Sequence, residues 1–190
     1  MDKTNCINKI KSAVRNGNHP DPPVSDAFQQ TSVIALLMFN QEIKLMFIQK
    51  ADVKGYAWAN QMAFPGGHKD KKDASTKETA LRELAEEMGI SKDNVEVVGS
   101  LGHFQTMHHK SIEAFIGIWN QKDALAIDPA EISGVFNISL KYLIQLHKKK
   151  GYHARGTPNV MQLGYPFEDV LIWGVTAKIV YHLIETLLAE

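Results

Sequence analysis

Residues 75–90 read STKETALRELAEEMGI, and this stretch predicts one amphipathic helix with a defined start and end. Ser75 is a residue type suited to the N-cap, and Glu78 stands three residues later, where it completes a capping box. Gly89 stands where a left-handed residue commonly ends a helix. We therefore predict an α-helix over residues 76–88.

One face of this helix gathers acidic residues, and the opposite face is apolar. At ~100° per residue, Glu83, Glu86 and Glu87 fall within one narrow sector, nearly opposite Leu84 and Met88. Like charges four residues apart disfavour a helix, and so do anions in its last turn. A divalent cation held by the carboxylates would remove this conflict, and hard oxygen ligands favour Mg²⁺ or Mn²⁺. The alternative is an acidic face that contacts only solvent.

The rest of the chain predicts an α+β fold, with strands in the middle and helices spread along the sequence. Apolar, β-branched runs predict strands over residues 31–39, 43–50, 61–64, 95–104, 112–119 and 132–138. Further helices are predicted over residues 4–15 and 140–147, and near the end of the chain, where one apolar stripe comprises Val175, Ile179, Leu183 and Leu187. We expect residues 1–26 to form an N-terminal helix and a Pro-rich connector, and residues 27–190 to form the main domain.

The composition of the 190 residues narrows the class of partner. The 21 Lys and Arg residues balance the 21 Asp and Glu residues, so no overall charge attracts nucleic acid or an anionic membrane. Polar residues such as Lys178 make the last helix a poor membrane span. The lone Cys6 fits a reducing compartment, so we expect a cytoplasmic protein. A small molecule that carries phosphate would have to be bound at one local site.

The acidic helix and the residues before it resemble the signature of the Nudix hydrolases. In that signature a Gly precedes an Arg-Glu-apolar-x-Glu-Glu-x-Gly-apolar run, and residues 82–90 match this run at every specified position. Gly67 lies one residue further upstream than in the pattern, and Ala74 stands where the pattern has a Glu. This one-residue insertion, with Asp73 as the nearby acid, is similar to the Nudix subfamily of coenzyme A diphosphatases. The resemblance covers residues 31–188.

The resemblance implies a Nudix-type α/β/α sandwich with a mixed central β-sheet. It also implies Mg²⁺-dependent (or Mn²⁺-dependent) hydrolysis of a diphosphate linkage, in which water activated by the metal ion attacks one phosphorus. Glu83, Glu86 and Glu87 would bind the metal ion, and Arg82 would hold these acids in place. The alternative for Arg82 is an ordinary surface pair with Glu78.

Four further acidic or glycine positions are candidates near this cluster. Gly66 and Gly67 are expected to form a turn that brings backbone atoms close to the metal ion or a phosphate, or simply to end a strand. Asp73 either orients Arg82 or only precedes the helix. Glu131 is a candidate general base or additional metal ligand, with a solvated loop acid as the alternative.

Residues 50–60 come before the Phe-Pro-Gly-Gly run and read KADVKGYAWAN. In the subfamily this stretch usually supplies basic residues, and here its positive charges are Lys50 and Lys54, which are candidates for binding the substrate. Tyr56 and Trp58 are candidates for stacking on an adenine ring. The alternative for both aromatic residues is a core position or a contact in a homodimer.

The substrate is expected to be a small nucleoside diphosphate derivative, and the subfamily resemblance makes coenzyme A the leading candidate. The small number of basic residues in residues 50–60 favours a rival such as ADP-ribose, a dinucleotide or a nucleotide sugar. A further hypothesis is a catalytically silent Nudix domain that senses a ligand. The three glutamates and Arg82 argue against this hypothesis, because a protein that only binds needs no activated water.

Overall fold

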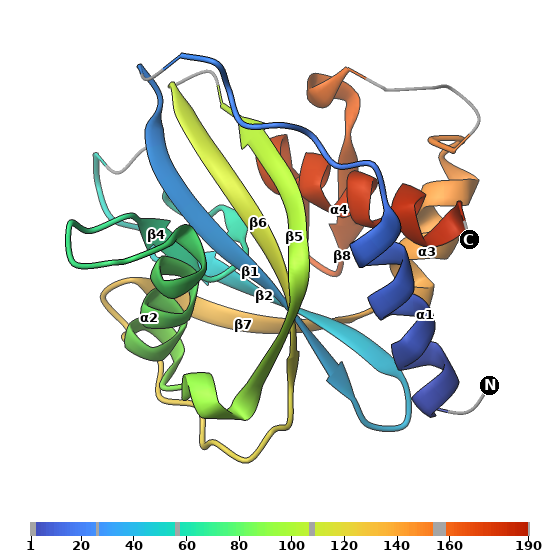
Figure 1. Cartoon of the computed structure of the whole chain (residues 1–190), viewed down its shortest axis with the longest axis horizontal. Helices are drawn as coiled ribbons and strands as arrows, with labels where there is room; N and C mark the ends of the chain where they lie inside the picture. Colours follow the sequence, from blue (N-terminus) through green and yellow to red (C-terminus); the bar gives the residue numbers. More distant parts are fainter. Residues whose placement is uncertain (1–2, 26, 56–57, 107–108, 154–158, 190) are drawn as a thin grey trace.

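The computed structural model describes residues 3–25, 27–55, 58–106, 109–153 and 159–189, and Figure 1 shows the arrangement of their elements. The helices are α1 (Lys3–Asn16), α2 (Thr76–Met88), α3 (Leu140–Lys149) and α4 (Gly174–Leu188), with 3₁₀ turns η1 (Lys92–Asn94) and η2 (Val160–Gln162). The strands are β1 (Gln29–Phe39), β2 (Ile43–Lys50), β3 (Met62–Ala63), β4 (Gly66–His68), β5 (Val95–Gln105), β6 (Lys110–Trp119), β7 (Ile132–Ser139), β8 (Gly164–Phe167) and β9 (Val170–Trp173).

Strand β1 lies at the centre of a mixed sheet, as the family resemblance implied. It pairs in parallel with β6 and antiparallel with β2 and β4. The order across the sheet is β3-β2-β1-β6-β5, with β7 paired on β2. Strand β2 pairs with β1 only as far as Met46, after which it pairs with β3, while the start of β1 pairs with β4. The two central strands therefore separate on one side, with β3 and β4 between them.

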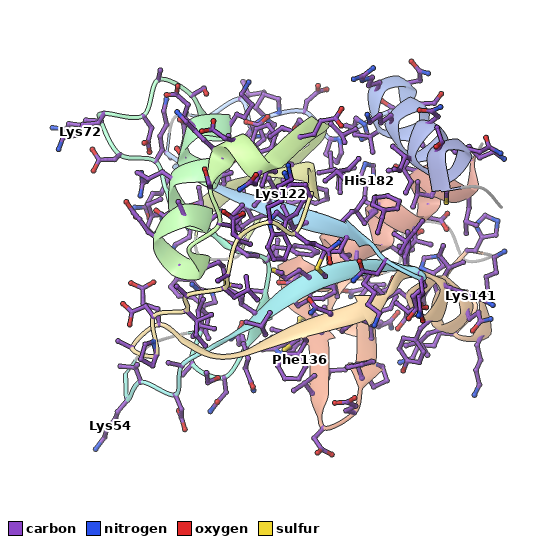
Figure 2. All side chains as sticks on the ribbon, turned by 90° about the horizontal axis from the view of Figure 1, so that it is seen from below. Lys54, Lys72, Lys122, Phe136, Lys141 and His182 are labelled. Carbon is purple, nitrogen blue, oxygen red and sulfur yellow. The ribbon has the colours of Figure 1, made fainter. Side chains whose placement is uncertain are left out.

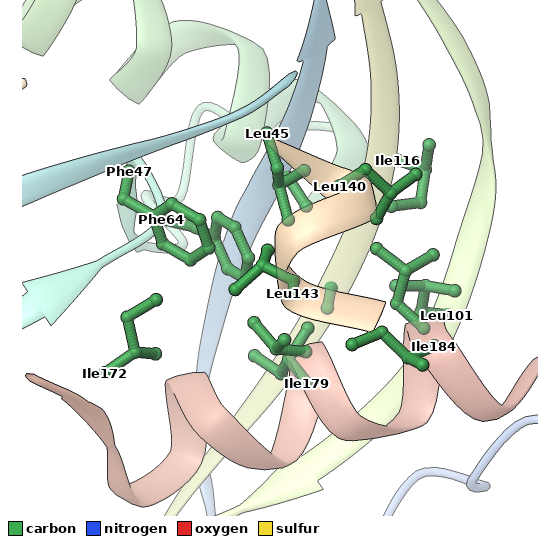
Figure 3. Packing of buried hydrophobic residues seen from close by; sticks show 14 of the residues in the cluster. Leu45, Phe47, Phe64, Leu101, Ile116, Leu140, Leu143, Ile172, Ile179 and Ile184 are labelled. Carbon is green, nitrogen blue, oxygen red and sulfur yellow. The ribbon is translucent and has the colours of Figure 1, made fainter. Parts of the chain in front are cut away.

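Helices cover both faces of this sheet. On one face, Ala80, Leu84 and Met88 of α2 pack against Ile34 and Leu36 of β1. On the other face, residues of α1, α3 and α4 pack against the opposite side of β1 and β2, where Figure 1 shows the three helices. Figure 3 shows part of this core between α3, α4 and the sheet. Because the side chains of a strand alternate between faces, β1 contributes to both cores. The predicted α/β/α sandwich is confirmed.

The predicted boundaries agree best where local sequence signals set them. Helix α2 spans the predicted residues, the Ser75 Oγ accepts a hydrogen bond from the Glu78 N–H at 3.2 Å, and Gly89 ends the helix with a φ of 70°. The capping box differs in one detail, because the Glu78 carboxylate accepts from the Ala74 N–H at 2.8 Å.

Two strand pairings differ from the sequence prediction. Strand β4 contains Gly66 and Gly67, which we expected in a turn, and the β8–β9 hairpin was not predicted at all. Glycine has a low strand propensity, and Pro166 lies within β8, so local patterns do not favour either strand. Pairing with β1 and β9, respectively, decides their conformation.

Helix α1 packs on the main domain, since Ile10 and Val14 belong to the same core as α3 and α4. The connector follows β5, where the Pro20 carbonyl accepts from the His103 N–H at 2.8 Å. The His19 Nε2 donates to the Val14 carbonyl at 2.6 Å, so its Nδ1 accepts from the His182 Nε2 of α4 at 2.9 Å. The division of the chain between residues 26 and 27 stays a prediction, and Asp26 lies outside the described residues.

Two further observations concern the helices and the single cysteine. Among the described residues, no helix combines the length and apolarity that crossing a membrane requires. The free thiol of Cys6 is partly buried.

The stability of this fold should depend on the protonation of His182. Burial, with His19 and Lys178 nearby, lowers the pKa of His182 from 6.5 to about 4. The folded state therefore favours the neutral ring, so its contribution to stability is present above pH 6.5 and is lost as the pH falls toward 4. We expect the free energy of unfolding in urea to fall more between pH 7 and pH 5 in the wild type than in His182→Gln. A His109→Gln control, at an exposed ring, should keep the wild-type dependence; equal slopes in wild type and His182→Gln would contradict the prediction.

Candidate active site

The site begins where the backbone of β4 lies against the acidic face of α2. The Gly66 N–H donates to the Glu87 Oε2 at 3.0 Å. A Cβ atom added at Gly67 would lie 2.4 Å from the Glu83 carboxyl carbon, and one added at Gly66 would lie 2.2 Å from the Ser32 carbonyl oxygen. A side chain at Gly66 would push β4 away from the backbone of β1, whereas a side chain at Gly67 would displace the Glu83 carboxylate, so both glycines are needed for this arrangement.

Glu87 is the most buried acid of the cluster. Its side chain is 2% exposed, and it forms an ion pair with Lys50, the last residue of β2. Burial raises the pKa of Glu87, and the Lys50 ammonium and the Gly66 N–H oppose that shift. A buried carboxylate needs such partners, since an unpaired charge in the interior is strongly disfavoured. Lys50 therefore supplies the counter-charge for the buried acid of this face.

Arg82 connects the two more exposed acids of this face. Its guanidinium donates two hydrogen bonds to Asp73, both at 3.0 Å, one to Glu83 at 3.0 Å and one to Glu86 at 2.9 Å. It also donates to the carbonyl of His68 at 3.1 Å, which ties α2 to β4. The Arg82 hydrogen bonds are the main reason that the pKa of Asp73 is held well below its usual value. Asp73 thus contacts Arg82 in the way that the first of its two predicted roles requires.

A cavity of about 310 Å³ opens in front of these acids, at the place where β1 and β2 separate. It brings together most of the predicted site residues, namely Lys50, Trp58, Gly66, Gly67, Glu83, Glu87 and Glu131. Burial raises the pKa of Glu83, against the opposing effect of Arg82, and Glu131 adds to the negative charge around it. Aromatic and aliphatic side chains from α4 and the strand before it complete the wall, among them Trp173, Val175 and Ile179.

Other predicted residues lie outside this cavity. Glu86 is 60% exposed and faces Arg82, whose own side chain lies behind Glu83 and does not line the cavity. Lys54 is exposed, and Figure 2 shows it at the edge of the molecule, so the structure does not bring it to the site. Tyr56 lies outside the described residues.

The oxygen donors fit a hard divalent cation in part. Glu83 and Glu87 line one cavity, and the absent side chain of Gly67 leaves space directly in front of Glu83. Within the described ranges, however, no three His, Cys, Asp or Glu side chains converge closely enough to hold a metal ion. Glu86 could join the other two acids only after it leaves Arg82. The set of three metal ligands therefore stays a prediction.

Two basic residues of the cavity, His68 and Lys110, were not predicted from the sequence. His68 directly follows Gly67, and its Nδ1 lies 3.0 Å from the Thr31 Oγ1. Lys110 begins β6, and its Nζ lies 3.8 Å from the centre of the Trp58 ring. The position of His68 next to the diglycine was a usable signal, whereas nothing local marks Lys110, which reaches the site through the parallel pairing of β1 and β6.

Comparison with known proteins identifies the class. The family model for the NUDIX domain matches residues 29–160. A relative from Photorhabdus laumondii, named uncharacterized Nudix hydrolase NudL, is 30% identical over 172 residues, which cover 86% of this chain and 89% of that protein. A protein of the same name from Yersinia pestis is 29% identical and covers 82% of this chain and 78% of its own length.

Solved structures agree at the level of the fold. A MutT/nudix family protein from Enterococcus faecalis superposes with a TM-score of 0.55 at 17% identity, covering 100% of this chain and 76% of that chain. DR0079 from Deinococcus radiodurans superposes with a TM-score of 0.53 at 16% identity, covering 84% and 87% of the respective chains.

The protein is therefore a pyrophosphohydrolase by class, with a mixed-sheet sandwich and an acidic helix face beside a diglycine strand. The chain belongs to the Nudix hydrolase family, whose members generally use divalent metal cations and act on nucleoside diphosphate derivatives.

Alanine at Gly67 should impair this site more than the fold. The Gly67 backbone is not left-handed, and the clash would be with the end of the flexible Glu83 side chain, so the stability loss should stay below about 1 kcal/mol. Displacement of the Glu83 carboxylate should lower kcat/KM by about 100-fold, since displacements near 1 Å have effects of that size. Gly164→Ala, outside the cavity, serves as the control in urea unfolding and in the assay. Wild-type kcat/KM in Gly67→Ala would show that Glu83 need not occupy its present position.

Proposed function

We propose that this protein hydrolyses the diphosphate linkage of a nucleoside diphosphate derivative in an Mg²⁺-dependent or Mn²⁺-dependent reaction. The observation that carries the proposal is the shared cavity of Glu83 and Glu87, which lie against a strand that has no side chain at Gly67. Carboxylate oxygens are the preferred ligands of these hard cations. Membership of the Nudix family adds independent support.

Each polar residue has a distinct task in this proposal. Glu83 and Glu87 would hold the cation, and Glu86 would join them after release from Arg82. A bound divalent cation neutralises phosphate oxygens and lowers the pKa of a water molecule that serves as the nucleophile. Arg82, fixed by Asp73, keeps Glu83 in position through its hydrogen bond at 3.0 Å.

Glu131 is the proposed general base. It is exposed, it lines the cavity, and its charge acts on Glu83, so it lies close enough to influence a water molecule there. A base on a loop outside the acidic helix is suited to accept a proton from water without competing for the metal ion.

The cavity wall favours a substrate with an aromatic or aliphatic part beside its phosphates. Trp58, Phe64 and Trp173 supply aromatic surface, and bases stack on such rings. Coenzyme A remains the leading substrate through the subfamily resemblance. The rival class comprises ADP-ribose, dinucleotides and nucleotide sugars. The positions of the two predicted lysines favour this rival class. Lys54 does not line the cavity and Lys50 pairs with Glu87, so neither lysine is available as a basic residue for coenzyme A.

A catalytically silent ligand sensor is the remaining candidate. The buried Glu87, the Arg82 network and the open space before Glu83 argue against it, because binding alone does not require them. A cytoplasmic location, a homodimer contact at the aromatic residues and the absence of nucleic acid partners stay predictions from the sequence.

A substrate panel tests the proposal directly. Coenzyme A, ADP-ribose and a diadenosine polyphosphate should be incubated separately with Mg²⁺ or Mn²⁺, and the products identified by mass spectrometry. We expect cleavage of at least one diphosphate linkage, complete loss of activity with EDTA, and recovery when the metal ion is returned. Coenzyme A should give 3′,5′-ADP and phosphopantetheine if it is the substrate. Cleavage of none of these compounds would favour the sensor.

Glu87→Gln should remove activity and also weaken the fold. The amide keeps an oxygen for the Gly66 N–H but loses the charge that faces Lys50, so unfolding should become easier by roughly 1–3 kcal/mol. Loss of a metal-binding charge should lower kcat by about 100-fold or more, or roughly 2.7 kcal/mol. Glu86→Gln, at the exposed acid, should leave stability within about 0.5 kcal/mol of wild type. Full Mg²⁺-dependent activity in Glu87→Gln would contradict the assigned site.

A further inference from the structure

The cavity contains a second lysine, whose surroundings differ from those of Lys50. Whereas Lys50 pairs with Glu87, no carboxylate forms an ion pair with Lys110 among the residues that the structure describes. The Lys110 Nζ lies 3.8 Å from the centre of the Trp58 ring and 3.1 Å from the His68 Nε2. The Lys110 ammonium thus contacts the face of an aromatic ring and an imidazole nitrogen, and neither group carries a negative charge that would neutralise it.

The hydrogen bonds fix the state of His68. An ammonium group has only donors, so the His68 Nε2 must accept from Lys110, and the ring proton lies on Nδ1, which donates to the Thr31 Oγ1 at 3.0 Å. Burial and the nearby Lys110 charge both lower the pKa of His68, which keeps the ring neutral. Burial also lowers the pKa of Lys110. His68 therefore orients the ammonium and does not compete with it for an anion.

Strand β4 sets the distance between this cation and the acidic face. Gly66 contacts Glu87, Gly67 faces Glu83, and His68 contacts Lys110, in consecutive positions of one strand. Each strand residue advances by about 3.3 Å. Some oxygens of a bound diphosphate would contact the cation held by the acids. The remaining oxygens of that diphosphate would then lie within reach of the Lys110 ammonium.

We propose that Lys110 is a substrate-binding residue that binds a non-bridging oxygen of the substrate diphosphate, with Trp58 and neutral His68 holding its ammonium in place. The proposal rests on the proposed function and names a further residue of the same site. A partly buried cation without a carboxylate partner gains its counter-charge when an anionic ligand binds. Lys50 cannot take this role while it neutralises Glu87.

The test separates binding from turnover. The dissociation constant of ADP is measured by calorimetry in EDTA, and KM and kcat are measured with the best substrate of the panel. Lys110→Gln should weaken ADP binding about tenfold or more and raise KM by a similar factor, with a smaller effect on kcat, since charge-assisted hydrogen bonds contribute at this level. Lys110→Arg should recover part of the affinity. Lys122→Gln removes an exposed lysine that does not line the cavity (labelled in Figure 2), and it is the matched control.

Several results would overturn this assignment. The assignment would be wrong if the wild type did not bind ADP. It would also be wrong if the wild type and Lys110→Gln had equal dissociation constants for ADP. A loss confined to substrates with an additional phosphate monoester would also exclude the diphosphate as the partner of Lys110. Urea unfolding of both Lys110 variants establishes that they are folded, and Lys110→Arg carries the test if Lys110→Gln is not. Lysine-dependent ADP binding without hydrolysis of any panel compound would contradict the proposed function and leave this assignment standing.

Discussion

The contact between the bare backbone of β4 and the acidic face of α2 is the constraint on which the remaining structure of the site depends. Gly66 reaches Glu87 with its N–H, and the absence of a side chain at Gly67 lets Glu83 lie directly over the strand. Because β4 pairs with β1, this contact joins the acids to the centre of the sheet. Lys50 and Arg82 then compensate the charge from two sides. The site is thus an extension of the fold.

The electrostatic arrangement divides the acids by exposure. Glu87 is buried and paired with Lys50, Glu83 is partly buried at the cavity wall, and Glu86 is largely exposed beside Arg82. An exposed ion pair contributes little, so Glu86 can change partners at small cost, whereas Glu87 cannot. This graded burial suits the proposed site, in which Glu87 is held in place and Glu86 changes its partner when a cation binds. His68 and Lys110 add polar groups to the wall of the same cavity.

The sequence predicted those features that depend on neighbours along the chain. The ends of α2, the shared face of the glutamates and the core stripe of α4 follow from spacing alone, and all three appear in the structure. Features that depend on pairing between distant segments were harder to predict. Gly66–His68 forms a strand only because β1 is beside it, and Lys110 reaches the cavity through the register of β6. Lys54 was predicted to bind the substrate because it lies close to Lys50 in the sequence. In the structure Lys50 lines the cavity and Lys54 does not.

One side of α2 packs in the core and the other side carries the acids. This division explains which neighbouring segments of the chain can gain or lose residues. One residue inserted within the helix would rotate everything after it by about 100°, which would turn Glu87 toward Leu36 and expose Met88. The exposed turn at residues 69–72 has no such restriction, because Asp73 closes it through the Asp70 N–H. The additional residue that separates this chain from the general Nudix pattern falls before the helix, in the segment where a change of chain length leaves the phase of the helix intact.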